Sequence, residues 1–393
     1  MPTRVTRYVI AELTKVFVAT VSALVALLVL VGIVQEGLKN GLTPAVMLRL
    51  IPFTLPNAMC IALPGSVLFA VCSVFGRISA SNEIVAIKSL GISPRVVMLP
   101  AIWFATIASA ANVWLMDVGY CWGYPGIQRV VISSIRETAY SVLRTKHDFS
   151  THGVSFHVRE VRDDRLVEPL IVARAGNQTI TISAREAELR RDDNPEVLML
   201  SLTDGRVEVG STASFSFTDT IEYPLPLGLK NERSALRNPA HVWSHQIRSE
   251  GKLQSQRIAS LEESLAVTTA FQITGGDFSA LRNDEWKNRH ADLAAAQQRL
   301  IRLRLEPWRR WASGFSCLAF ALVGVPLAIR MRNADFLTSF FLCFLPILLV
   351  YYPLFAFGLD QAKTGDLPPH AIWLGNLVCV LIGIYLIRYV QRR

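Results

Sequence analysis

Six apolar segments dominate this chain, and a long polar stretch over residues 119–306 separates the third from the fourth. A bilayer with hydrocarbon about 30 Å thick is crossed by roughly 20 apolar residues in an α-helix. Each segment is close to that length and keeps charge out of its interior, where one charged residue would cost about 2.5–3.5 kcal/mol. The sequence therefore predicts six membrane-spanning helices, here numbered spans 1–6, over residues 16–34, 58–75, 96–116, 311–329, 336–357 and 371–387.

Lysine and arginine in the short connections predict the orientation of the spans. The positive-inside rule places the more basic connections in the cytoplasm. Cations precede span 1, lie between spans 2 and 3 and between spans 4 and 5, and follow span 6. Both termini are therefore expected in the cytoplasm and the polar stretch outside it. In a Gram-negative bacterium this describes a multi-pass inner-membrane protein with a periplasmic domain. The cations are Arg4, Arg7, Arg77, Lys88, Arg95, Arg330, Arg332, Arg388, Arg392 and Arg393.

Composition and motifs exclude several functions. The net charge of +9 is concentrated in these connections, where anionic lipid is the ordinary partner, so we expect no nucleic-acid binding. The chain lacks the phosphate-binding loop of ATPases and the common hydrolase motifs, so we expect no enzyme activity and no bound cofactor or metal. His241 and His245 have the spacing of a metal pair but no further ligands, and we interpret them as surface residues.

The first part of the polar stretch contains short segments in which apolar residues alternate with polar ones. They are separated by turn residues, and Asp204-Gly205 predicts a hairpin turn between two of them. Six or more short strands at this spacing predict a sandwich or a jelly roll. The predicted strands cover residues 154–161, 169–175, 179–189, 196–202, 206–209 and 213–223.

The polar stretch ends in two helical segments. Residues 246–265 and 284–305 are rich in helix formers and are separated by Gly275-Gly276, which predicts a helical hairpin outside the membrane. Pro307 is interpreted as the start of span 4. The chain thus divides into residues 1–118 with spans 1–3, a jelly-roll-like domain over 119–238, a helical insertion over 239–306, and residues 307–393 with spans 4–6.

The connection between spans 2 and 3 predicts a short helix over about residues 81–92. Glu83 lies in its first turn, where the helix dipole favours a carboxylate. Gly91 suits its C-terminal cap. Its apolar face is formed by Ile84, Ile87 and Leu90. Either this helix lies on the inner leaflet, or it docks a cytoplasmic partner that offers a cation to Glu83.

The motif of this helix resembles the coupling helix of the lipopolysaccharide export permeases of the LptF/LptG (YjgP/YjgQ) family. The resemblance covers nearly the whole chain and rests on an ordered set of short matches. The helical insertion over residues 244–288 is longer than the family leads us to expect. The matching motifs are Arg7-Tyr8 with Glu12-Leu13, Leu63-Pro64, Glu83-Ile84-Val85-Ala86 with Gly91-Ile92-Ser93, Ile182-Ser183-Ala184-Arg185, Leu200-Ser201-Leu202-Thr203-Asp204-Gly205, Glu306 with Arg309 and Arg310, and Gly324-Val325-Pro326-Leu327.

The resemblance implies one permease subunit of an ATP-driven (ABC) transporter. Its expected partners are a sibling permease and a cytoplasmic dimer of an LptB-like ATPase, which would carry the ATP and Mg²⁺. The short helix would couple that ATPase to the spans through Glu83, Ile84, Ile87, Leu90 and Gly91. Lipopolysaccharide would be extracted from the inner membrane and passed to a periplasmic bridge of LptC/LptA-like jelly rolls.

The chemistry of lipopolysaccharide suggests where this chain would touch it. Cations near the outer ends of the spans would meet the phosphates of lipid A, and we select Lys39, Arg129, Arg136 and Arg304. A snorkelling surface cation is an equal alternative for each. Phe215 and Phe217 mark a lipid path in the strand domain, unless that domain has a filled core and only docks partners by strand addition.

Two other functions fit parts of the sequence. A permease for another envelope lipid or lipoprotein would share the spans and the coupling helix. A non-transporting envelope scaffold would explain the strand domain but not the helix that contains Glu83. A secondary transporter fits less well, because no span interior carries a charge for ion coupling.

Overall fold

A computed structural model describes residues 2–40, 42–89, 91, 93–134, 140, 143–144, 148–151, 154–162, 165–175, 178–191, 197–209, 213–226, 238–276, 283–331 and 336–392. The chain forms two compact units. The first comprises residues 1–29, 55–123 and 239–393, and the second comprises residues 30–54 and 124–238.

Six helices of the described residues are long and apolar enough to cross a membrane, which confirms the predicted number of spans. Several continue beyond the apolar segments, because their ends are amphipathic and carry charge. The spans are formed by α1 (Pro2–Asn40), α2 (Pro44–Ala80), α4 (Arg95–Val118) with the π-helix η1 (Gly119–Gly123) and α5 (Tyr124–Ser133), α9 (Asp284–Gly314) with α10 (Ser316–Arg330), η4 (Ile347–Tyr351) with α12 (Tyr352–Thr364), and η5 (Pro369–Trp373) with α13 (Leu374–Arg392). The fifth span also includes residues 340–346 of the short helix α11 (Phe336–Pro346), which leads into η4.

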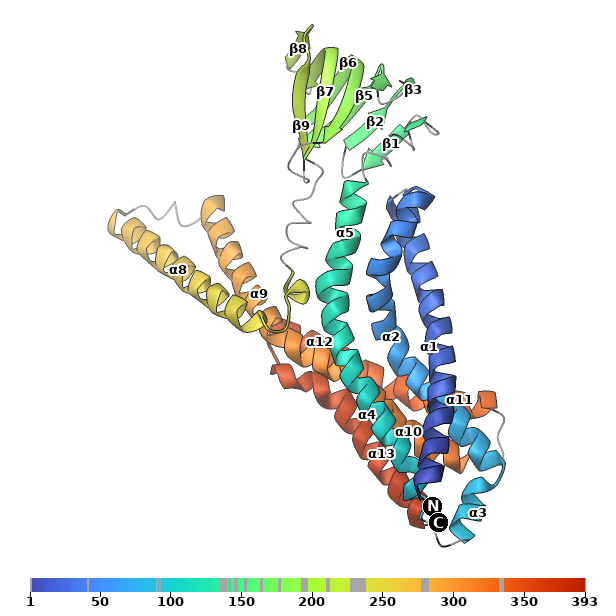
Figure 1. The fold of residues 1–393 in the computed structure, drawn as a ribbon. Coiled ribbons are helices and arrows are strands. Elements are labelled where there is room, and N and C mark those ends of the chain that lie inside the picture. The colour runs from blue at the N-terminus through green and yellow to red at the C-terminus, as the bar shows by residue number, and fades with distance from the viewer. Residues whose placement is uncertain are drawn as a thin grey trace. The chain divides into compact units, whose positions relative to one another are not determined.

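The first unit packs around α10. Its apolar core joins α10 to α2, α4 and α13, with Phe75, Met98 and Val325 almost fully buried. The hydroxyl of Ser79 donates to the carbonyl of Ile329 at 2.7 Å and fixes α2 to α10. Gly383 lets α13 approach closely, because a Cβ there would lie 2.8 Å from the carbonyl oxygen of Leu322. The beginning of α1 and the end of α13 lie together near α3 (Glu83–Ser89), as Figure 1 shows.

A pair of antiparallel helices extends from the first unit. In α8 (Ile247–Thr274), Ile258 and Leu265 are buried, as is Leu303 of α9. The amide of Gln254 donates to the carbonyl of Ala296 at 2.9 Å and fixes the register of the pair. The predicted helical hairpin is therefore present. The interpretation of Pro307 is wrong, because α9 continues through it and ends at Gly314. A Cβ on Gly314 would lie 2.3 Å from Val113, so glycine allows α9 to meet span 3 at this point.

The second unit contains a single antiparallel sheet between spans 3 and 4. Its path of strands is β1-β2-β5-β6-β4-β3, and β7 pairs with β6, β8 and β9. Ile171, Ile182 and Leu200 are buried in its core. This sheet confirms a strand domain at the predicted place. The strands are β1 (Asp148–Thr151), β2 (Val154–His157), β3 (Glu160–Arg162), β4 (Arg165–Val167), β5 (Leu170–Ala175), β6 (Gln178–Arg191), β7 (Val197–Val209), β8 (Ala213–Phe217) and β9 (Ile221–Pro226).

The hairpin prediction at Asp204-Gly205 is wrong. Both residues lie inside β7, which runs without a turn along β6. Asp204 has a φ of 51°, a left-handed conformation that bends the strand locally. The bend separates the part of β7 paired with β9, residues 197–202, from the part paired with β8, residues 205–209. The Asp-Gly pair thus marks a change of partner along one strand.

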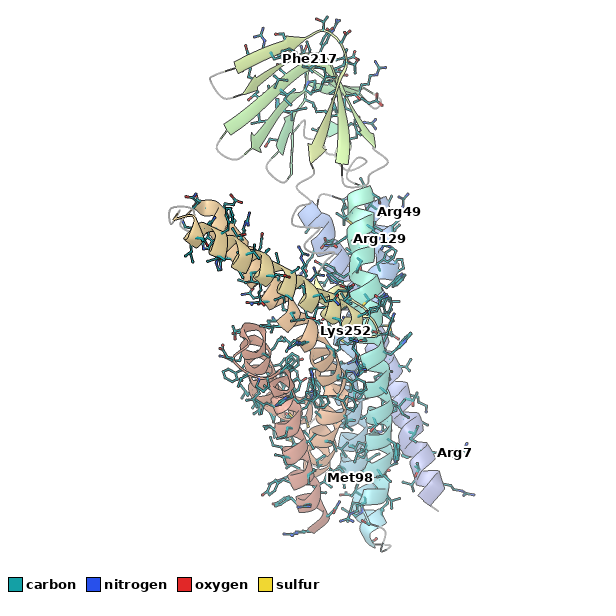
Figure 2. All side chains as sticks on the ribbon, turned by 90° about the vertical axis from the view of Figure 1, so that its left-hand side faces the viewer. Arg7, Arg49, Met98, Arg129, Phe217 and Lys252 are labelled. Atoms are coloured by element: carbon teal, nitrogen blue, oxygen red, sulfur yellow. The ribbon has the colours of Figure 1, made fainter. Side chains whose placement is uncertain are left out.

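Residues 30–54 pack within the second unit. Leu42, Val46 and Leu50 are buried between the end of α1 and the start of α2, and Ile127 and Val131 of α5 pack against them. Figure 2 shows Arg49 and Arg129 on these helical segments. The apolar contacts join helical segments that are far apart in the sequence into one cluster within the second unit.

Candidate functional site

A buried arginine organises the end of spans 3 and 4 from which the helix pair extends. The side chain of Arg310, on α9, is 2% exposed and forms an ion pair with Asp117, the last residue but one of α4. Its guanidinium also donates to the hydroxyl of Ser244 at 3.1 Å and to the backbone carbonyls of Ala240 and Val242 at 3.0 and 2.8 Å. Arg310 therefore binds the segment that enters α8 to both spans.

A second arginine completes this ionic cluster. Arg309 donates to Glu306 at 2.7 Å, and its guanidinium lies 4.6 Å from the centroid of the Tyr120 ring. The carboxylate of Glu306 also lies 3.7 Å from Nε of Arg310. Glu306 is buried, so its negative charge is compensated by both arginines, as buried ions require. We call Asp117, Tyr120, Glu306, Arg309 and Arg310, together with His241 and Ser244, the ionic cluster.

His241 joins the cluster through its ring. It belongs to the short 3₁₀ helix η2 (Pro239–His241), and its Nδ1 donates to the carbonyl of Tyr120 at 2.8 Å. Partial burial lowers the pKa of His241 below its ordinary value of 6.5, and the arginines act in the same direction. The interpretation of His241 as a plain surface residue is therefore wrong, whereas His245 is exposed.

The local backbone positions the cluster. The π-helical turn η1 follows α4 directly and contains Tyr120. A π-helical turn contains one more residue than an α-helical turn, and it therefore rotates the side chains that follow it about the helix axis. Pro239 and the 3₁₀ turn bring the carbonyls of Ala240 and Val242 to the same guanidinium. The arrangement can hold three segments rigidly together, and it can release them only by exposing buried charge.

The short helix predicted between spans 2 and 3 is α3. Gly91 has a φ of 76°, the left-handed conformation expected of a C-terminal cap. Glu83 lies in the first turn and accepts a hydrogen bond from the hydroxyl of Ser81 at 2.9 Å. Ile84 is 5% exposed and belongs to the core of the first unit, and Ile87 packs against that core. The apolar face thus seats α3 on the spans, and Val85, 48% exposed, faces outward. Leu90 lies outside the described residues.

Two of the four predicted lipid contacts can be placed in the structure. Arg129 and Arg304 are exposed, and they belong to different units. The side chain of Lys39 and the whole of Arg136 lie outside the described residues. The sequence pattern thus located two exposed cations but missed the ionic cluster, which uses the neighbouring Glu306, Arg309 and Arg310. The sequence did contain a signal for this cluster, because Asp117 follows the apolar segment of span 3 and Arg310 directly precedes that of span 4.

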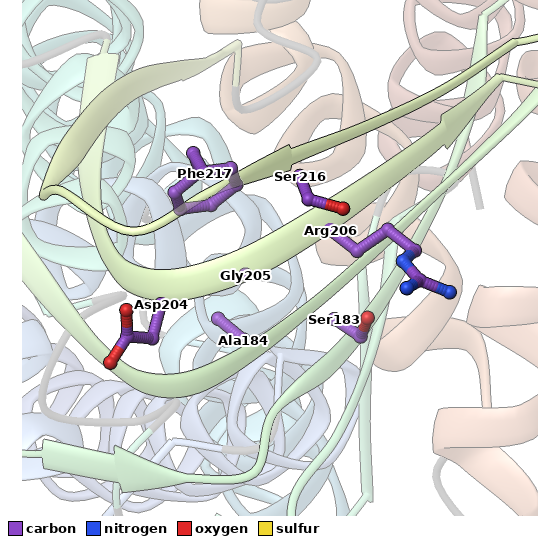
Figure 3. Close-up of a pocket in the computed structure, with 7 residues that line it drawn as sticks. All are labelled: Ser183, Ala184, Asp204, Gly205, Arg206, Ser216 and Phe217. Atoms are coloured by element: carbon purple, nitrogen blue, oxygen red, sulfur yellow. The ribbon is translucent and has the colours of Figure 1, made fainter.

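The two phenylalanines differ in environment. Phe217 packs against the sheet core, and Phe215 is 62% exposed on the same face of β8, with ring centroids 6.5 Å apart. Phe217 closes one side of a hollow of about 380 Å³ at the bend of β7 (Figure 3). The hollow is also lined by Ser183, Ala184, Asp204, Gly205, Arg206 and Ser216.

The spans, the sheet and the ionic cluster describe a multi-pass membrane protein that carries a strand domain between its third and fourth spans. The chain belongs to the family of lipopolysaccharide export system permeases LptF/LptG, which matches residues 7–389. No curated protein matches the chain. The family assigns it to a membrane-embedded transport component of lipopolysaccharide export, not to an enzyme class.

Proposed function

We propose that this chain is a permease subunit of an ATP-driven transporter that extracts lipopolysaccharide from the inner membrane. The match to the export permeases over residues 7–389 carries this proposal. A sibling permease would pair with it, and an LptB-like ATPase dimer would bind on the cytoplasmic side and hold the ATP and Mg²⁺. LptC/LptA-like bridge proteins would receive the lipid in the periplasm. The strand domain would be a jelly roll of the same kind.

The seating of α3 supports coupling to the ATPase. Ile84 and Ile87 fix the helix to the core of the spans, so a push on α3 is transmitted to that core. Val85 is exposed, and Glu83 is half-buried at the start of the helix, where it accepts the hydrogen bond from Ser81. A cation on the ATPase would bind Glu83 through a charge-assisted hydrogen bond. The beginning of α1 and the end of α13 lie at the same end of the unit as α3 (Figure 1), which agrees with cytoplasmic termini.

The lipid would be recognised by charge and by apolar surface. Arg129 and Arg304 are exposed and would contact lipid phosphates, as would Lys39 and Arg136. Phe215, exposed beside Phe217 on an edge strand, would contact acyl chains as they leave the membrane. A photo-crosslinker at Phe215 that captured only proteins would favour a domain that docks partners without holding lipid.

Charge reversal at Glu83 tests the proposal. The full complex would be purified through a tag on this chain, and its ATPase activity and its release of lipopolysaccharide from proteoliposomes would be measured. Glu83→Arg should reduce recovery of the ATPase or uncouple hydrolysis from release. Asp292→Arg, a charge reversal at an exposed position of the helix pair, is the control. Normal binding and release in Glu83→Arg would refute coupling through α3. If the complex released another envelope lipid in place of lipopolysaccharide, the proposal that lipopolysaccharide is the substrate would be refuted.

A further inference from the structure

The α8–α9 helix pair carries its charge unevenly. We define its foot as residues 247–254 of α8 and 299–305 of α9, the part adjoining the spans. The foot contains Arg248, Lys252, Arg299, Arg302 and Arg304 against Glu250 alone. The far part of the pair, residues 255–274 of α8 and 284–298 of α9, contains Arg257, Lys287 and Arg289 against Glu262, Glu263, Asp284, Glu285 and Asp292. The pair is therefore basic at its foot and acidic beyond it.

The foot adjoins the apolar segment of span 4. Arg304 precedes Trp311, the first residue of the apolar segment, by seven positions on one helix, which corresponds to about 10 Å. Trp308 and Trp311 are 45% and 52% exposed, as expected of tryptophans at headgroup depth.

The start of α8 is held at the same level. The hydroxyl of Ser244 donates to Asp117 at the end of span 3 at 2.7 Å. The bond between Gln254 and Ala296 then places the first turns of α8 beside the part of α9 that follows Ala296. Arg248 and Lys252 are therefore level with the arginines of α9. Figure 2 shows Lys252 at the foot, at the opposite end of the span bundle from Arg7 and Met98.

Four cations of the foot have no ion pair within the described residues. Arg248, Lys252, Arg302 and Arg304 are exposed, and within the described residues no ion pair or side-chain hydrogen bond reaches them. Glu250 offsets one of these charges, and Asp117 and Glu306 are already engaged, because they bind Arg309, Arg310 and Ser244. The charge of the foot must therefore be balanced from outside the unit.

We propose that the foot binds the anionic headgroups of phospholipids on the face of the bilayer from which the helix pair extends. Phosphate at headgroup depth has the charge and the position that these cations require, and a flat lipid surface can reach several of them at once. The acidic remainder of the pair is repelled by the same surface. Anionic phospholipid would thus hold the helix pair at a defined tilt, independently of any transported lipid.

A lipid titration tests this proposal on the full-length chain in non-ionic detergent. Energy transfer from tryptophan to dansyl-labelled phosphatidylglycerol would report binding, and labelled phosphatidylcholine would measure background. Arg248→Gln with Lys252→Gln should weaken phosphatidylglycerol binding about tenfold or more, with little change for phosphatidylcholine. Added salt should reduce the difference. The exchange Arg248→Lys with Lys252→Arg should restore binding, because it keeps both charges.

The matched control is Lys287→Gln with Arg289→Gln, which removes two cations from the far part of the same pair and should change binding less than twofold. Equal binding of the two lipids by the wild type, or equal behaviour of the foot and control variants, would overturn the proposal. Displacement of phosphatidylglycerol by an equal phosphate concentration of lipopolysaccharide would assign the foot to the transported lipid and would also overturn it. The assay contains no ATPase, so its outcome is separate from that of the export test.

Discussion

Arg310 and Asp117 are 193 positions apart in the sequence and form an ion pair that joins spans 3 and 4, in which the arginine is buried and the carboxylate is partly buried. The same guanidinium binds two backbone carbonyls of the segment that leads into α8. The side chain of Arg310 is almost inaccessible, so water cannot replace a lost partner. The pair is therefore a fixed point between the spans and the helix pair.

Removing one member of this pair should destabilise the first unit strongly. Asp117→Ala removes one of the carboxylates that compensate the buried positive charge of Arg310. We expect the free energy of unfolding to fall by about 3–5 kcal/mol. Thermal unfolding in detergent would measure it. Asp292→Ala removes an exposed carboxylate from α9 and should change stability by less than about 0.5 kcal/mol.

The double variant Asp117→Leu with Arg310→Met separates a lost pair from an unpaired charge. Removing both partners should cost less than the sum of the single changes, because neither charge remains buried alone. Additive losses would show that the two residues do not interact.

The sequence allowed prediction of the features that depend on local composition. The spans follow from the length of the apolar segments, and the helix pair follows from helix propensity. The cap at Gly91 follows from the preference of glycine for a positive φ at the end of a helix. The ionic cluster depends on the packing of α4 against α9, so Asp117 and Arg310 could be recognised as charges at span ends but not as partners. The hairpin prediction at Asp204-Gly205 is wrong because a local turn signal cannot distinguish a hairpin from a bend inside a long strand.

The two faces of α3 should respond differently to charge. Ile84→Asp places a carboxylate in the core of the spans and should destabilise the chain by several kcal/mol. Val85→Asp changes an exposed position and should leave the thermal midpoint nearly unchanged. If α3 couples to the ATPase, Val85→Asp should reduce ATPase recovery while the fold persists. The comparison therefore separates a folding role from a docking role.

Acidification should loosen the anchoring of the segment before α8. The pKa of His241 is lowered in the folded chain, so the unfolded chain binds more protons just below pH 6.5. The contribution of His241 to stability is complete above pH 6.5 and is lost as the pH falls through its lowered folded pKa. Protonation would occur at Nε2, since Nδ1 already donates to Tyr120. Thermal midpoints of wild type and His241→Gln from pH 8 to 5 should converge on acidification if His241 is responsible.

Gly205 and Gly251 should respond oppositely to alanine. A Cβ at Gly205 would lie 2.6 Å from the ring of Phe217 and 2.7 Å from the carbonyl oxygen of Ser183. Gly205→Ala should therefore displace β8 or open the β6–β7 ladder, at a cost of about 1–3 kcal/mol. A Cβ at Gly251, inside α8, would meet nothing within 4 Å, so Gly251→Ala should stabilise the helix by up to about 1 kcal/mol. Amide hydrogen exchange would locate each effect, with faster exchange in β7 and β8 for the first variant and slower exchange in α8 for the second. Unchanged exchange in β8 of Gly205→Ala would show that Phe217 does not rest on this glycine.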